Sequence, residues 1–387
     1  MPTGRCRVLV APDKFKGSLT AAEAAERLAR GLRAARPDWP VRTLPVADGG
    51  DGTVDAAVSA GFDRRTATVP GPVGEPVPAS FALRNEVAVV ELAEAGGLRR
   101  LPRGEDPLGA HTRGTGALIA AALAAGAKTI VLGVGGSAST DAGTGLLTAL
   151  GVRFVDNEGR PVADGGGHLH RIAAADLSGL DPRVRRTRFL LASDVDNPLL
   201  GPNGAAAVYG PQKGASPADV ALLEAGLRNV VNVLGADATT AAAAADLPGA
   251  GAAGGAGYAA LAVLGATRRS GIDLVLTTIG FDRALADADL VITGEGRLDA
   301  QTLRGKAPAG VARAAGARGL PVLAVCGQLD LSPQETAAAG FAAAYALTDL
   351  EPDPAKSIAD AGPLLQRLGE RIARDWSART TSTPENS

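Results

Sequence analysis

The chain has 387 residues and a formal net charge of −2, and its composition is 46% hydrophobic and 21% charged. This length fits one large domain or two moderate ones, and the near-neutral charge with scattered arginines predicts no nucleic-acid partner. Because there is no run of eighteen apolar residues, no secretory signal and only two cysteines, we expect a cytoplasmic protein with no membrane partner.

The first sixty residues predict two strand–helix units. Residues 6–11 and 41–46 are short apolar runs that are typical of buried strands. A capping box opens at Thr20 and starts a helix that must end before Pro37, and a second helix is expected from residue 53. Strands that alternate with helices in this way favour a parallel sheet.

The middle of the chain interrupts this alternation. Prolines and glycines cluster over residues 70–78, and the apolar runs 79–83 and 87–92 that follow predict a hairpin. The pattern then predicts helices at 114–125, 143–150 and 217–234, and strands at 129–134, 152–155 and 188–193. Residues 235–260 are rich in Ala and Gly, and they are either low-complexity filler or a loop that approaches another segment closely.

The alternation returns near residue 289. Strands are expected at 289–293, 321–326 and 342–347, with helices from about 307 and over the apolar repeat that ends at Trp376. These elements predict a doubly wound α/β domain formed by residues 1–62 and 286–387, interrupted by a second α/β domain over 63–285.

Acidic residues follow four of the predicted strands. They are Asp13, Asp48, the pair Asp194 and Asp196, and Glu295. One such acid usually caps a helix or forms a turn, but open α/β sheets bind ligands at this end of their strands. Clustered carboxylates therefore indicate a magnesium–phosphate site or a general base.

Residues 133–141 form a glycine-rich loop between a predicted strand and a helix. Such a loop lets backbone N–H groups approach an anion, although it is neither a Walker A motif nor a G-x-G-x-x-G motif and an ordinary connection is the alternative. Four of the six lysines, namely Lys14, Lys16, Lys213 and Lys306, also lie in Gly/Pro turns near these segments. Acids, an N–H cradle and cations together predict a nucleotide-dependent phosphotransferase.

The same segments resemble the class I glycerate kinases. The matching stretches are 11–19, 46–53, 135–138, 194–199, 210–214 and 293–299, followed by Gln301 and 305–306. The resemblance implies a flavodoxin-like domain with a second α/β domain inserted, an active site in the cleft between them, and transfer of phosphate from ATP to D-glycerate with Mg²⁺. Two departures are Asp51, where the family often has Glu, and Thr140, where Asn is common.

The resemblance also implies roles for individual residues. Asp194 would orient or deprotonate the glycerate hydroxyl, although a turn ahead of Pro198 is the alternative role for Asp194 and Asp196. The remaining residues would act as follows: Lys14, Arg297 and Lys306 neutralise the carboxylate and the transferring phosphate; Gly135, Gly136 and Ser137 hold ATP; Asp48 or Glu295 binds Mg²⁺; and Asp13, Lys16, Asp196, Asn197, Lys213 and Asp299 contact substrate or phosphate.

The expected product is 2-phospho-D-glycerate. The alternatives are the 3-phosphate, a kinase for another small hydroxy acid, and a ligand-binding relative without turnover. An intact acid at each strand end argues against the last of these. The sequence gives no prediction of the oligomeric state.

Overall fold

The computed structural model describes residues 5–236 and 239–381, and the chain divides into two compact units. The first unit comprises residues 1–48 and 275–387, and the second comprises residues 49–274. The first unit is therefore built from both ends of the chain, with the second inserted between them.

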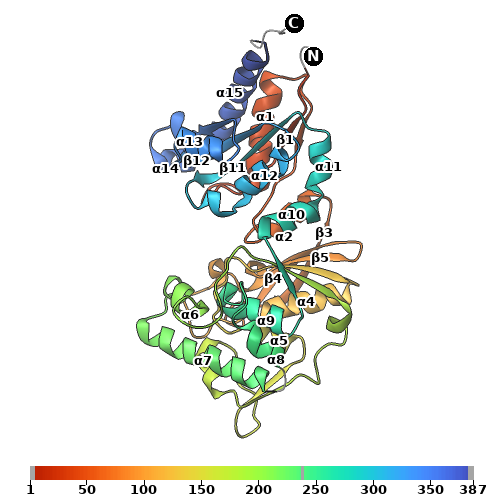
Figure 1. Ribbon diagram of the computed structural model, residues 1–387, viewed down its shortest axis with the longest axis vertical. Helices are drawn as coiled ribbons and strands as arrows, with labels where there is room; N and C mark the ends of the chain where they lie inside the picture. Colours follow the sequence, from red (N-terminus) through yellow and green to blue (C-terminus); the bar gives the residue numbers. More distant parts are fainter. Residues whose placement is uncertain (1–4, 237–238, 382–387) are drawn as a thin grey trace. The chain divides into compact units, whose positions relative to one another are not determined.

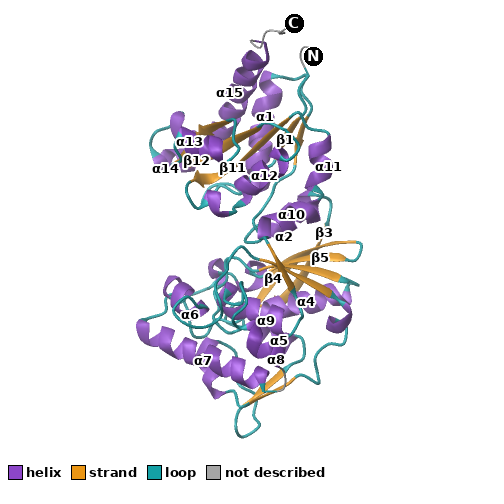
Figure 2. Ribbon diagram, in the orientation of Figure 1, coloured by secondary structure: helices purple, strands orange, loops and turns teal. Residues whose placement is uncertain are grey.

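The first unit contains a five-stranded parallel sheet (Figures 1 and 2). Its strand order is β13-β12-β11-β1-β2, which is the flavodoxin-like order 2-1-3-4-5 when the strands are counted within the unit. The strands are β1 (Val8–Val10), β2 (Val41–Thr43), β11 (Leu290–Leu298), β12 (Val322–Leu329) and β13 (Ala343–Ala346). The prediction of a flavodoxin-like doubly wound sheet is confirmed.

Two long helices, α1 (Ala21–Ala35) and α15 (Ala361–Thr381), run side by side in this unit (Figure 1). The capping box predicted at Thr20 is present at the start of α1. A Cβ atom on Gly31 would lie 1.9 Å from the Gln366 carbonyl oxygen, so glycine lets the two helix backbones approach closely. The remaining helices of the unit are α11 (Phe281–Ala286), α12 (Ala307–Gly316), α13 (Pro333–Ala338) and α14 (Pro354–Ala359).

The second unit contains a six-stranded mixed sheet of order β10-β9-β6-β5-β4-β3. Its strands are β3 (Asp63–Pro70), β4 (Pro76–Arg84), β5 (Val87–Glu91), β6 (Thr129–Gly133), β9 (Arg188–Ala192) and β10 (Thr267–Arg269). The predicted hairpin is the antiparallel pair β4–β5, and β3 adds a strand that the sequence analysis did not expect. The strands β5, β6, β9 and β10 are parallel, so their carboxyl ends share one edge of the sheet.

The larger helices of this unit flank that sheet and its loops (Figure 1). They are α2 (Thr53–Ser59), α4 (Arg113–Ala124), α5 (Thr144–Ala149), α6 (Ala205–Tyr209), α7 (Pro217–Gly235), α8 (Thr239–Ala244) and α9 (Ala256–Ala262), and a small hairpin pairs β7 (Arg153–Val155) with β8 (Ala174–Asp176). A Cβ on Gly254 would lie 2.0 Å from the Ser139 carbonyl oxygen. This contact favours the close-approach interpretation of residues 235–260 over low-complexity filler.

The unit boundaries differ from those expected at residues 62 and 285. The helix α2 packs against β4 and β5, so residues 49–62 belong to the second unit. Helix α10 (Gly271–Ile279) contains the other boundary, which lies after Leu274. The cleft location of the active site stays a prediction.

Within the described ranges, no helix is both long and apolar enough to cross a membrane.

Candidate active site

Two acidic residues near the carboxyl end of the first unit's sheet, Asp13 and Glu295, have raised pKa values. Asp13 follows β1 and is only 6% exposed, and its N–H donates to the Gly294 carbonyl at 2.8 Å. Burial raises the pKa of Asp13 to about 7; the Lys14 charge opposes this shift, whereas the charges of Asp48 and Glu295 add to it. Lys14 also donates its backbone N–H to Asp13 Oδ1 at 2.6 Å.

Glu295 is a buried carboxylate with two partners from the segment that follows it. Thr302 Oγ1 donates to Glu295 Oε1 at 2.6 Å, and Lys306 Nζ lies 3.5 Å from Oε2. Burial raises the pKa of Glu295, and both partners oppose that rise. The Lys306 side chain is 32% exposed, so it can reach a ligand while it remains beside Glu295.

Asp299 forms the turn that positions Thr302. Its Oδ1 accepts the N–H groups of Gln301 at 2.8 Å and Thr302 at 3.2 Å. This turn role is visible in the structure, whereas a contact of Asp299 with substrate stays a prediction. Thr302 is fully buried, and the sequence analysis missed it because nothing local distinguishes it from a surface threonine.

Arg297 and Lys16 are the exposed cations of this region. Arg297 forms an ion pair with Asp330, and Nε lies 2.5 Å from its Oδ2. Gln328 donates to the other oxygen of Asp330 at 2.9 Å. Lys16 is exposed on the turn between Phe15 and Leu19. Both cations are accessible to an anionic ligand.

In the second unit, the predicted glycine-rich loop follows β6. The backbone N–H groups of Gly135, Gly136 and Ser137 donate to no acceptor within residues 5–236 and 239–381. Gly136 has φ of +73°, a left-handed conformation that glycine adopts at little cost. Successive N–H groups left available next to a left-handed residue form an anion-binding concavity. This loop therefore fits phosphate.

The loop over residues 49–53 packs directly against this glycine-rich loop. A Cβ on Gly135 would lie 2.5 Å from the Gly50 Cα, so no larger residue fits there without a shift. Two of the segments that carried the family resemblance are thus neighbours in space although they are far apart in the sequence.

Glu91, at the end of β5, holds that neighbouring loop. It is 4% exposed, and Oε2 accepts the N–H groups of Gly52 and Val54, each at 3.1 Å. Burial raises its pKa to about 8, the Val54 hydrogen bond opposes the shift, and Glu94 adds to it. The sequence analysis missed Glu91, although an acid at a strand end was the signal used for the others.

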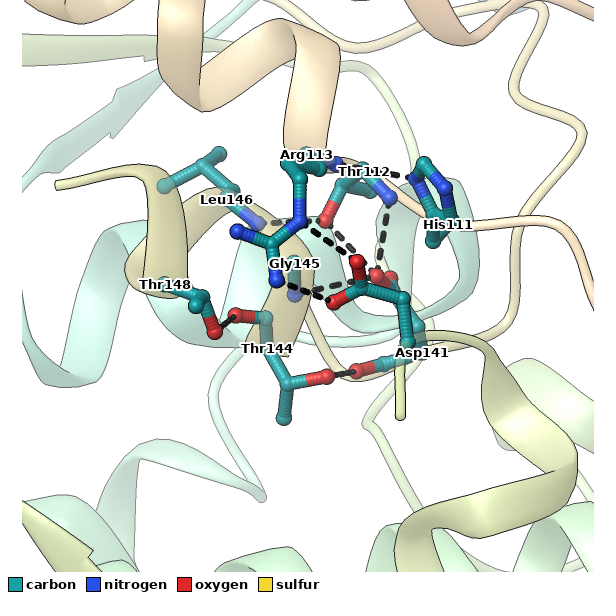
Figure 3. Close-up of polar contacts among 9 residues, drawn as sticks. His111, Thr112, Arg113, Asp141, Thr144, Gly145, Leu146 and Thr148 are labelled. Atoms are coloured by element: carbon teal, nitrogen blue, oxygen red, sulfur yellow. Dashed lines mark hydrogen bonds and ion pairs between the residues drawn. The ribbon is translucent and has the colours of Figure 1, made fainter. Parts of the chain in front are cut away.

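Asp141 fixes the far end of the glycine-rich loop (Figure 3). It is fully buried, and Oδ2 accepts the N–H and the hydroxyl of Thr112, each at 2.8 Å. Oδ2 also accepts the Gly145 N–H at 3.2 Å, and Oδ1 accepts the Gly143 N–H at 3.1 Å. This carboxylate therefore joins the starts of α4 and α5 to the loop.

Lys213 is buried against the same glycine-rich loop, and only 3% of its surface is exposed. Its Nζ donates to the Ser139 carbonyl oxygen at 2.5 Å. Burial lowers the pKa of Lys213 to about 8, and the charge of Asp141 opposes that shift. In this structure Lys213 is directed into the protein, unlike Lys14 and Lys306, which remain partly exposed.

The Asp194–Asn197 segment follows β9 at the same edge of the second sheet. Asp194 is exposed, and its Oδ1 accepts the Gly271 N–H at 2.9 Å. Arg268 Nη2 donates to Asp196 Oδ1 at 2.5 Å, and the Tyr209 hydroxyl donates to Asn197 Oδ1 at 2.7 Å. The Asp194 and Asp196 carboxylates contact residues 77 and 72 positions further along the chain, so the turn role weighed for them stays a prediction, as does a contact of Asp194 with a ligand.

The fold and these loops define the class of protein. Parallel strands with acids and cations near their carboxyl ends, together with a backbone cradle for anions, are the parts of a phosphoryl-transfer enzyme. A sequence model of the glycerate kinase family matches residues 8–377 of this chain. The chain belongs to the glycerate kinase family, and it is a kinase.

Individual proteins that are similar to this chain carry the name of the same family. The chain is 43% identical over 376 residues to the glycerate kinase of Bacillus subtilis (strain 168), which covers 96% of this chain and 97% of that protein. It is 44% identical over 328 residues to the glycerate 2-kinase of Escherichia coli (strain K12), covering 84% and 85% of the two chains. A crystal structure from Salmonella typhimurium LT2, provisionally assigned as glycerate kinase 2, has a TM-score of 0.84 and 38% identity, covering 98% of this chain and all of that one.

Proposed function

We propose that this kinase transfers the γ-phosphoryl group of ATP to the 2-hydroxyl of D-glycerate and releases 2-phospho-D-glycerate and ADP. The observation that carries the proposal is the set of free N–H groups at Gly135, Gly136 and Ser137 beside an edge that also presents the Asp194 carboxylate. The likeness to a protein named glycerate 2-kinase supports the position of transfer.

In this reaction a bond forms between the glycerate oxygen and the γ-phosphorus, while the bond from that phosphorus to the leaving oxygen of ADP breaks. Asp194 accepts the hydroxyl proton as the new bond forms, and it later returns the proton to water. Positioning and charge neutralisation contribute most to such a loose transition state. Lys14, Lys306 and Arg297 supply the positive charge for the glycerate carboxylate and the phosphates, and Lys16, Asp196 and Asn197 complete the binding set.

Mg²⁺ is the metal we propose to accompany ATP. No group of three or more His, Cys, Asp or Glu side chains within the described ranges is arranged to hold a metal ion. Magnesium in kinases is usually bound by one or two carboxylates together with substrate phosphates, so Asp48 and Glu295 fit such a partial site. When bound, the ion would neutralise charge on the phosphates, and a cytoplasmic location is part of the same proposal.

Phosphorus NMR of the product from ATP and D-glycerate tests this function. The expected result is a resonance of 2-phosphoglycerate with stoichiometric ADP. A resonance of 3-phosphoglycerate would contradict the position of transfer, and turnover only with another hydroxy acid would contradict the substrate. Omission of Mg²⁺ should abolish the signal, whereas full activity in chelator would contradict the role of the metal.

A further inference from the structure

Lys213 occupies an unusual place for a lysine in a chain with only six of them. Its side chain is 3% exposed, and its ammonium group donates to a backbone carbonyl rather than to a carboxylate within ion-pair distance. A buried ammonium is costly unless its donors are used. The carbonyl that receives this hydrogen bond is therefore held firmly.

That carbonyl belongs to Ser139, within the glycine-rich loop. It also accepts a hydrogen bond from Ser137 Oγ at 3.2 Å, and Ser137 Oγ in turn accepts the Ser139 N–H at 3.1 Å. The backbone of Gly254 packs against the same oxygen so closely that a Cβ there would lie 2.0 Å away. The Ser139 peptide thus has its carbonyl fixed toward the interior.

Asp141, two residues further on, fixes the other end of this segment through its four hydrogen bonds to backbone and hydroxyl groups. The segment is therefore held between a buried cation and a buried anion, which attract each other. Asp141 is the charged group that faces Lys213 in the described part of the chain.

We propose that Lys213 is a positioning residue: by holding the Ser139 carbonyl inward, it sets the conformation in which Gly135, Gly136 and Ser137 present their N–H groups to phosphate. Lys213 does not itself contact ATP. The consequence for catalysis rests on the proposed function, whereas the consequence for the loop itself does not.

Amine labelling of the unaltered protein tests whether Lys213 is buried and makes no contact with ATP. After a short exposure to acetic anhydride, mass spectrometry should find Lys128 and Lys356 modified and Lys213 unmodified, both with and without ATP. Rapid labelling of Lys213 in the free protein, prevented by ATP, would overturn the proposal, because it would identify Lys213 as a ligand contact. The result for the free protein is independent of whether the chain phosphorylates glycerate.

Variants of Lys213 test whether this residue sets the conformation of the glycine-rich loop. Lys213→Met should speed hydrogen exchange of the amides at residues 137–142 in the ATP-free protein and lower kcat by roughly 100-fold, the cost of a displacement of about 1 Å. Lys213→Arg should restore most of the exchange protection and rate. Lys128→Met, which removes an exposed lysine paired with Glu86, is the control and should change neither.

An effect of Lys213→Met on the KM for ATP alone, with unchanged exchange in the free protein, would overturn the positioning role. If the Met variant does not fold, the amine-labelling result still tests the proposal by itself. Changed loop exchange without any kinase activity in the unaltered protein would contradict the proposed function and leave the loop contact supported.

Discussion

The Thr302 hydroxyl donates a hydrogen bond of 2.6 Å to Oε1 of Glu295. Thr302 is itself positioned by Asp299, whose Oδ1 accepts its N–H at 3.2 Å. A residue predicted to contact substrate thus supports, through Thr302, a residue predicted to bind metal.

Thr302→Val should lower both activity and stability. The substitution preserves shape but removes the donor from a buried carboxylate, which costs about 1–3 kcal/mol. We expect a lower midpoint of urea unfolding and a fall in kcat, with Thr302→Ser recovering most of both. Thr187→Val, which removes a hydroxyl bonded to the Arg183 carbonyl, is the control. Equal loss in the Ser and Val variants would show that the hydroxyl is not the important group.

Asp194→Asn should reduce kcat by about 10²- to 10⁴-fold, the usual contribution of a general base. Asn retains the oxygen that accepts the Gly271 N–H, so this contact with the start of α10 should survive. Asp176→Asn is a matched control, because Oδ1 of Asp176 accepts the Ser178 N–H at the same 2.9 Å. Steady-state kinetics with D-glycerate decide the matter: a rate for Asp194→Asn within a few-fold of the unaltered protein would exclude Asp194 as the base.

Glu91 should make the protein less stable as pH rises from about 4.5 to 8. Its pKa is about 8 in the folded state against a usual 4.5, so the folded state keeps a proton that the unfolded state releases. The free energy of unfolding then falls with pH, by at most about 1.4 kcal/mol per pH unit. Urea unfolding between pH 5 and 8 should show a shallower fall for Glu91→Gln.

Glu86→Gln is the control for this titration, because Glu86 is exposed and paired with Lys128. It should retain the slope of the unaltered protein. Identical slopes for Glu91→Gln and the unaltered protein would show that Glu91 has no raised pKa. Asp13 contributes in the same direction up to its pKa of about 7, so some slope should remain in the Glu91 variant.

Gly31→Ala should destabilise the first unit although alanine is the better helix former. The added Cβ would lie 1.9 Å from the Gln366 carbonyl oxygen, so α1 and α15 must move apart. We expect a loss of about 1–3 kcal/mol in calorimetry, typical of overpacking. Gly316→Ala is the control: it is also helical, has no atom within 4 Å of the added Cβ, and should be neutral or stabilising. Equal stability of the two variants would contradict close packing at Gly31.

The regular elements could be predicted from the sequence because their signals are local. The capping box at Thr20 and the hairpin around Asn85 depend on a few neighbouring residues. The strand expected at 289–293 extends to Leu298 in the structure, since Glu295 pairs with Cys326 of β12. Glycines and charges over 294–297 resemble a loop until a partner strand supplies hydrogen bonds.

The site could be predicted only in part, for a similar reason. The acids at the ends of the strands and the glycine-rich loop were found because chemistry and position coincide in the sequence. The burial of Lys213 was not predictable, since it depends on Ser139, which is 74 residues away in the chain. Whether a lysine faces solvent or a carbonyl is decided by tertiary packing alone.

The discontinuous first unit also sets an order for synthesis on the ribosome. Val8 pairs with Leu290, so β1 meets this neighbour only after about 280 further residues have been added, roughly 14–56 s at the usual rates. Residues 49–274 are complete before then and can fold while translation continues. During that interval the edge of β1 that will pair with β11 stays unpaired, and an unpaired apolar strand edge is prone to aggregation until the last hundred residues emerge.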